Sequence, residues 1–91
     1  MSPRAQRQMR EIWRDIAVHN EPAADRLVQK LFDKFEVIAA HPEMGPARPE
    51  ISPEARLIIE GRYIAVCEPT NYGAEIIVVI HGMREPATWL D

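Results

Sequence analysis

Residues 76–86 read IIVVIHGMREP, and their apolar run stops at a histidine and a glycine. A short run of β-branched residues bounded by a glycine predicts a strand, which we place at residues 74–81. Its side chains are apolar on both faces, with Ile76, Val78 and Ile80 on one and Ile77 and Val79 on the other. Strands buried on both faces lie inside a sheet, so we expect this strand to be the innermost one.

Two further strands precede this one. Residues 55–60 (ARLIIE) and 62–68 (RYIAVCE) have the same β-branched character, and Gly61 alone separates them. Glycine at a tight turn supplies the positive φ that other residues avoid. Because short turns join all three strands, they are expected to form an antiparallel meander.

The first 40 residues repeat their apolar side chains with the period of a helix. Ser2-Pro3 is typical of a helix start. One apolar face follows, made of Ala5, Met9, Ile12, Trp13 and Ile16. Pro22 interrupts this face and fits the first turn of a second helix, which ends at His41-Pro42. Two amphipathic helices joined by a few residues form a helical hairpin.

Residues 41–54 contain four prolines and a glycine, a composition typical of a loop. Neither flank of this loop has enough residues to build a core alone, and a length of 91 residues suits one domain. The predicted fold class is therefore α+β, in a single domain of residues 1–91. An N-terminal helical hairpin packs on a C-terminal antiparallel sheet of three strands, with a fourth strand left open.

The charge distribution favours a protein partner over free nucleic acid. The net charge of −3 argues against a sequence-blind grip on phosphates. Residues 1–14 carry a net +3 and residues 15–91 a net −6, so an acidic body has a basic edge. The chain has no apolar run of membrane-spanning length and no signal peptide, so we expect a cytoplasmic protein.

Few residue patterns here support catalysis. The three histidines are far apart and the single cysteine, Cys67, has no partner, so neither a metal nor another cofactor is expected. Both serines precede prolines, which argues against a serine nucleophile. An acid–base site for RNA cleavage would draw on His81, Arg84, Glu85, Arg62, Arg56 and Tyr63. The acidic balance of the strand half and the distant lysines disfavour this nuclease site.

The ordered set of motifs over about 80 residues resembles the ParE toxins of the RelE/ParE superfamily, the toxic halves of bacterial type II toxin–antitoxin modules. The matching segments are Ser2-Pro3-Arg4-Ala5, Glu11-Ile12-Trp13, Ile16-Ala17, Ala23-Ala24, His41-Pro42-Glu43-Met44-Gly45, Arg56, Gly61-Arg62-Tyr63-Ile64, Ile76–Val79 and His81-Gly82-Met83-Arg84. The resemblance implies a helical hairpin on an antiparallel sheet. It also implies a toxin that binds and poisons DNA gyrase, without catalysis of its own.

The resemblance implies a ParD-like antitoxin as partner, in a heterotetramer or larger complex. Two alternatives remain open. One is a ribosome-dependent mRNA endonuclease of the RelE type, which usually has a C-terminal tyrosine. This chain has no tyrosine after Tyr72. The other is an inactive toxin that serves only as an antitoxin-binding co-repressor.

Candidate contacts follow from the same resemblance and from surplus apolar residues. The target-binding candidates are Arg84, His81, Glu85, Arg62, Arg56 and Trp89. The antitoxin-binding candidates are Met9, Trp13, Met44, Tyr63 and Met83. For Met9 and Trp13 the simpler interpretation, which we favour, is that they are core residues of the first helix. Trp89 is so near the end of the chain that it must dock on something or stay exposed.

Two features depart from the family pattern. Family members usually begin with a short strand, whereas only Met1 precedes Ser2 here, so either the start is truncated or the strand is lacking. A lacking strand would leave an unpaired sheet edge for another chain to cover. The last strand is usually followed by Arg-Asp, but here it is followed by Arg84-Glu85, whose carboxylate lies one methylene farther from the backbone.

Overall fold

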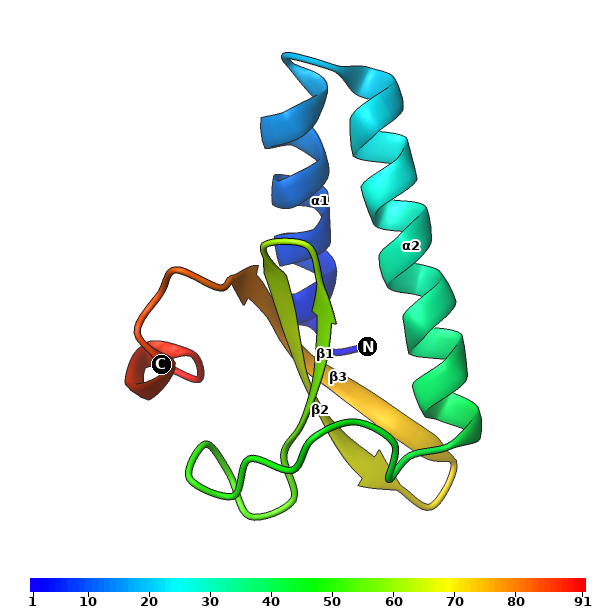
Figure 1. Ribbon diagram of the computed structural model, residues 1–91, viewed down its shortest axis with the longest axis vertical. Coiled ribbons are helices and arrows are strands. Elements are labelled where there is room, and N and C mark those ends of the chain that lie inside the picture. The colour runs from blue at the N-terminus through cyan, green and yellow to red at the C-terminus, as the bar shows by residue number, and fades with distance from the viewer.

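A computed structural model describes residues 1–91 as two helices followed by a three-stranded sheet. The elements are α1 (Pro3–Ala17), α2 (Glu21–Ala40), β1 (Arg56–Glu60), β2 (Tyr63–Thr70), β3 (Gly73–His81) and a 3₁₀ turn, η1 (Pro86–Thr88). The two helices stand side by side and the sheet crosses beside their lower halves (Figure 1). This arrangement confirms the predicted α+β fold, with a helical hairpin on a three-stranded antiparallel sheet.

Both helices begin where the sequence places a capping side chain. Ser2 Oγ accepts a hydrogen bond of 2.9 Å from the backbone N–H of Ala5. Asn20 Oδ1 accepts one of 3.1 Å from the N–H of Ala23, and a proline lies in the first turn of each helix. Each cap satisfies a backbone donor that has no partner inside the helix. Neither helix is long and apolar enough to cross a membrane.

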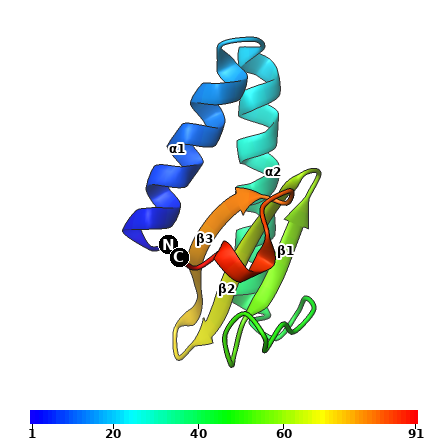
Figure 2. The same cartoon turned by 90° about the vertical axis from the view of Figure 1, so that its left-hand side faces the viewer.

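The sheet separates two apolar clusters. The helices cover one face, where the larger cluster consists of Ala5, Met9, Ile12, Leu31, Phe35, Ile38, Ile58, Ala65, Cys67, Ile76 and Val79. The second cluster is on the opposite face and consists of Ala55, Leu57, Val66, Val78, Ile80 and Trp89. Figure 2 shows the C-terminal turn lying across that opposite face. The C-terminal segment is therefore the second cover of the sheet.

The strand order β1-β2-β3 corrects our expectation that the last strand is innermost, because β2 is central and β3 is at an edge. A β-bulge also corrects the predicted faces. Val66 pairs with Val78 and Cys67 pairs with Ile76, so Ile77 has no partner. The extra residue shifts the alternation, and Ile77 therefore packs on the same cluster as Val78. The helices on one face of β3 and the C-terminal segment on the other explain its apolar run, although β3 is not the central strand.

The free edge of β3 is covered by the N-terminal segment. The backbone N–H of Ser2 donates to Ile76 O at 2.9 Å, and Ser2 Oγ donates to Ile77 O at 2.7 Å. Farther along, Val79 N–H donates to the Gln8 side chain at 2.8 Å. These bonds use the polar groups that an edge strand leaves unpaired. The expected open edge is thus closed in part by the chain itself.

The edge of β1 is covered by the proline-rich loop. Leu57 N–H donates to Pro46 O at 3.2 Å, and Ala47 forms an isolated antiparallel bridge with Arg56. Lys34 Nζ donates to Ile59 O at 2.5 Å on the remaining half of the strand. The fourth strand that the sequence left open is therefore represented only by this single bridge.

Gly45 lies where the loop passes closest to β1. Its φ is +94°, and an added Cβ would lie 2.7 Å from Leu57 O. We expect Gly45→Ala to lower the free energy of unfolding by about 2–3 kcal/mol, since both strain and collision oppose a methyl group. Gly61→Ala is the matched control, because Gly61 has φ +57° but no atom within 4 Å of an added Cβ. Urea unfolding followed by circular dichroism would contradict this account if both variants lost equal stability.

Candidate functional site: a cleft at the end of β3

The end of β3 and the polar face of α1 enclose a cleft of about 230 Å³. The lining residues are Gln8, Glu11, Ile12, Asp15, Tyr63, Val79, Ile80, His81 and Arg84. Tyr63 and His81 face each other across β2 and β3, and their ring centroids are 5.3 Å apart in an edge-to-face arrangement. The cleft therefore contains a cation, two carboxylates, an imidazole and a phenol.

His81 fixes the turn by which the chain leaves the sheet. Its Nδ1 accepts a hydrogen bond of 3.2 Å from Met83 N–H, and its carbonyl accepts one of 3.1 Å from Arg84 N–H. Gly82 N–H donates to Arg62 O at 2.7 Å. With Nδ1 acting as an acceptor, the proton of the neutral imidazole belongs on Nε2. The imidazole ring thus stabilises the turn through this hydrogen bond.

The residues after this turn point into solvent. Met83 is 87% exposed, and Arg84 and Glu85 are also exposed. The Arg84 guanidinium makes one long contact, 3.4 Å, with Thr88 O and forms no ion pair. Glu11 and Asp15 line the same cleft without pairing with it. The loop consequently presents an exposed cation that forms no ion pair within the chain.

Two of the predicted target contacts, Arg56 and Trp89, do not line this cleft. Arg56 lies at the far end of β1 and donates to Glu43 O at 2.8 Å and Gly45 O at 3.0 Å. Four residues of strand separate it from the turn, roughly 13 Å. Trp89 is 3% exposed, because the sheet face away from the helices needs a cover and its ring provides one.

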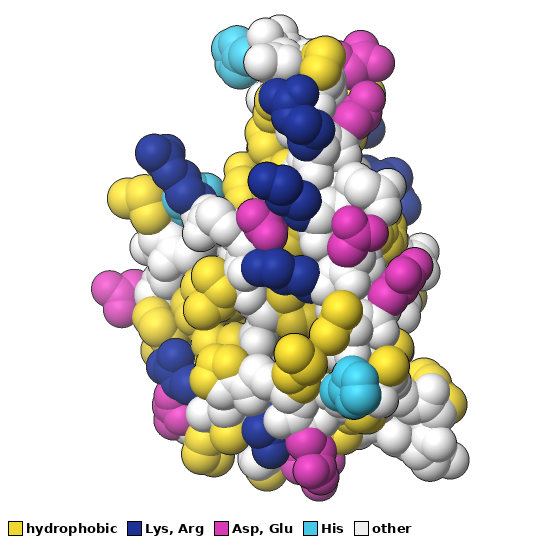
Figure 3. All heavy atoms as spheres, turned by 45° about the vertical axis from the view of Figure 1, so that its right-hand side comes forward, with side chains coloured by type: hydrophobic (Ala, Val, Ile, Leu, Met, Phe, Trp, Pro, Cys, Tyr) yellow, Lys and Arg dark blue, Asp and Glu magenta, His cyan; other side chains and the backbone are white.

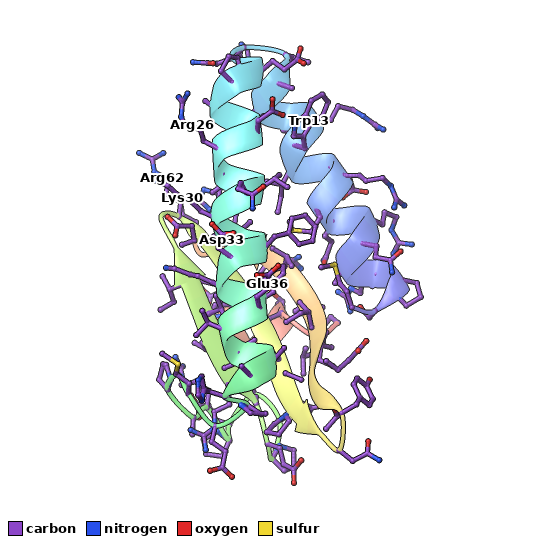
Figure 4. The ribbon with its side chains drawn as sticks, turned by 90° about the vertical axis from the view of Figure 1, so that its right-hand side faces the viewer. Trp13, Arg26, Lys30, Asp33, Glu36 and Arg62 are labelled. Carbon is purple, nitrogen blue, oxygen red and sulfur yellow. The ribbon has the colours of Figure 1, made fainter.

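Arg62 occupies the exposed β1–β2 turn, next to Tyr63 of the cleft. It projects on the same side of α2 as Arg26 and Lys30, whereas Trp13 lies toward the opposite side (Figure 4). The structure therefore brings His81 and Arg84 together with Tyr63, and leaves Arg62 and Glu85 at the exposed margins. Sequence reasoning missed the contribution of α1 to this cleft, made by Gln8, Glu11 and Asp15.

A larger groove of about 540 Å³ runs between the two helices. Its lining is Met1, Gln6, Met9, Arg10, Trp13, Arg14, Val28 and Phe32. Met9 is 5% exposed and forms the floor, whereas Phe32 is 42% exposed. Trp13 Nε1 donates to Asp25 Oδ1 at 2.7 Å, which ties the helices together and fixes the indole. The groove is apolar, with two arginines lining it from α1.

The antitoxin-binding candidates do not form one surface. Met9 and Trp13 share the groove between the helices, and Tyr63 belongs to the cleft. Met83 extends from the loop after β3. Met44 lies in another apolar groove, of about 330 Å³, between α2 and β1.

Basic side chains are exposed on α2. Figure 3 shows Lys and Arg side chains in a column down α2, with hydrophobic side chains exposed below them.

Cys67 lies away from the cleft, in the larger apolar cluster. It is 1% exposed, and burial raises its pKa from 9.0 to about 11, against the opposing charge of Arg56. Between these two pH values the native state binds more protons than the unfolded chain. The free energy of unfolding should therefore fall as pH rises through this window, by at most about 1.4 kcal/mol per unit.

Cys67→Ala removes this thiol and should flatten that part of the pH profile. Urea unfolding of both proteins from pH 8.5 to 10.5 measures the difference, while the lysines and tyrosines contribute equally to each. Parallel profiles would contradict a protected thiol.

A search of curated proteins found no match for this chain. Residues 1–86, almost the whole chain, match the family model described as the ParE toxin of the type II toxin–antitoxin system, parDE. The helical hairpin, the antiparallel meander and the family match agree with the resemblance seen in the sequence. The chain belongs to the ParE toxin family of type II toxin–antitoxin systems.

Proposed function

We propose that this ParE-family toxin poisons DNA gyrase by binding it, without catalysis of its own. The observation that carries the proposal is Arg84, an exposed arginine without an ion pair, on a turn that backbone hydrogen bonds hold at the end of the sheet. A charged side chain on an ordered turn is suited to a protein target, because the backbone that carries it has little conformational entropy left to lose on binding.

The arrangement of the cleft favours this proposal over the mRNA endonuclease. Arg56 is removed from the acid–base constellation, and His81 Nδ1 already accepts the Met83 N–H. A general base needs a free acceptor atom within reach of the proton that it abstracts. His81 would have to break its hydrogen bond with the Met83 N–H, which shapes the turn, to supply a free acceptor atom.

Neutralisation is assigned to a ParD-like antitoxin whose helical segment docks between α1 and α2. Phe32 and Trp13 offer apolar surface there, and Met9 forms a flexible floor. Amphipathic helices bind such grooves through apolar anchors spaced one turn apart. Arg10 and Arg14 line the groove, so acidic residues beside those anchors would complement it. A dimeric antitoxin would give a heterotetramer or a larger complex.

The proposal is tested by inducing the toxin without its antitoxin and following DNA supercoiling, replication and translation in the same culture. We expect supercoiling and replication to stall first, with gyrase trapped on cleaved DNA. Cleaved transcripts and an early stop of translation would instead support the endonuclease. Harmless induction would support the inactive co-repressor. The neighbouring reading frame should encode the antitoxin, with a ribbon-helix-helix start.

A further inference from the structure

Residues 84–91 form a strap across the sheet face that the helices leave uncovered (Figure 2). Trp89 anchors the strap because its ring is buried among Leu57, Val66, Val78 and Ile80. A buried tryptophan ring contributes a large apolar area to packing, so the anchor is strong relative to the exposed residues around it. The strap begins at Arg84 itself.

Hydrogen bonds connect this anchor to the loop that carries the exposed cation. Trp89 Nε1 donates to Arg84 O at 2.9 Å. Thr88 Oγ1 donates to Glu85 O at 2.8 Å, and Thr88 N–H donates to the same carbonyl at 2.9 Å. At the other end of the loop, His81 accepts from Met83 and Arg84. The backbone of Arg84 is consequently held from both sides.

The first helix ties down the other end of the strap. The Arg4 guanidinium donates to Leu90 O at 3.2 Å and also to Asp91 O. The same helix supplies Glu11 and Asp15 to the cleft that contains Arg84. The strap is therefore bonded to α1, the same helix that forms one wall of the cleft. The position of Arg84 relative to this wall thus depends on the strap.

We propose that Trp89 is the positioning residue for Arg84. Its ring provides the anchor, and its indole N–H, bonded to the Arg84 carbonyl, holds the backbone from which the guanidinium extends beside the cleft. This inference rests on the proposed function, in which Arg84 contacts gyrase. Preorganisation of this kind strengthens binding by reducing what must be ordered in the complex.

The test is to remove the N–H while keeping the ring. Trp89→Phe retains an aromatic side chain and loses the donor. A closer variant replaces Trp89 with benzothienylalanine, in which sulfur takes the place of the N–H. Native chemical ligation at Cys67, the only cysteine, joins a synthetic 67–91 segment to residues 1–66. The isosteric variant therefore decides the question even if Trp89→Phe folds poorly.

Two measurements are made on each folded variant. Hydrogen exchange should accelerate roughly tenfold at the amides of Met83 and Arg84, which both bond to His81, and affinity for gyrase should fall roughly tenfold. Affinity for the antitoxin should be unchanged, because the strap does not line the groove between the helices. Unchanged exchange in the isosteric variant would overturn the inference, as would faster exchange with undiminished gyrase binding.

The two proposals fail in distinguishable ways. If the unmodified toxin leaves gyrase unaffected, the proposed function is wrong, while hydrogen exchange still decides whether the indole N–H holds Arg84. If the unmodified toxin inhibits gyrase and the variants inhibit it equally well, the proposed function stands and Trp89 serves only as packing.

Discussion

Replacing Phe32 with lysine is expected to abolish neutralisation, with the Kd for the antitoxin raised by at least about 100-fold. Phe32 is 42% exposed on the wall of the groove between α1 and α2. A lysine there would have to place its ammonium group in an apolar groove or withdraw from it, and both outcomes remove an aromatic anchor. Arg10 and Arg14 line the same groove and would repel the new charge.

The stability of the toxin should be nearly unaffected, because Phe32 lies outside both buried clusters and lysine favours a helix. Its main loss is an edge-to-face contact with Phe35, whose ring centroid is 5.9 Å away. Co-expression of Phe32→Lys with the antitoxin should consequently leave the cells poisoned. Titration calorimetry with the purified antitoxin measures the lost affinity.

Val37→Lys is the matched control on the same helix. Val37 is 45% exposed and lines the separate groove between α2 and β1, with Met44. If the antitoxin docks between the helices, this variant stays neutralised. Loss of binding in Val37→Lys together with retained binding in Phe32→Lys would instead place the antitoxin on the β1 side, where Met44 lies.

The fold was predictable because local signals in this chain agree with one another. Ser2, Asn20 and two prolines mark the helix starts, and a helical apolar period changes to β-branched runs after residue 54. The order of the strands was harder to predict from the sequence. An apolar run with two covered faces can be central or at an edge, and residues 76–80 do not reveal that the C-terminal turn supplies the second cover.

The candidate site was predictable only for residues that are close together in the sequence. His81 and Arg84 are three residues apart after a strand, so their proximity is local. Glu11 and Asp15 join them through the packing of α1 on β3, and their spacing along a helix does not say which strand end they face. The sequence could not show that Trp89 is buried, since a tryptophan near a chain end can bind a partner or cover a core.

Removing the Arg84 side chain is expected to raise the toxin concentration needed for half-maximal inhibition of gyrase by about 100-fold. Arg84 is the exposed cation at the mouth of the cleft, and it has no intramolecular ion pair to lose. Folding should be unaffected in Arg84→Ala, because the backbone carbonyl that Trp89 binds is retained. The antitoxin should bind this variant with unchanged affinity, since Arg84 does not line the groove between the helices.

Arg26→Ala is the control for a general loss of charge. Arg26 also lacks an ion pair, but it projects from α2, toward the side of Arg62 (Figure 4). A supercoiling assay with purified gyrase separates the two variants, and equal inhibition by Arg84→Ala and the unmodified toxin would remove Arg84 from the site.

Arg84→Lys tests which property of the arginine matters. Lysine keeps the charge but not the planar fork of donors, so full recovery indicates a simple charge contact, whereas partial recovery indicates a bidentate one.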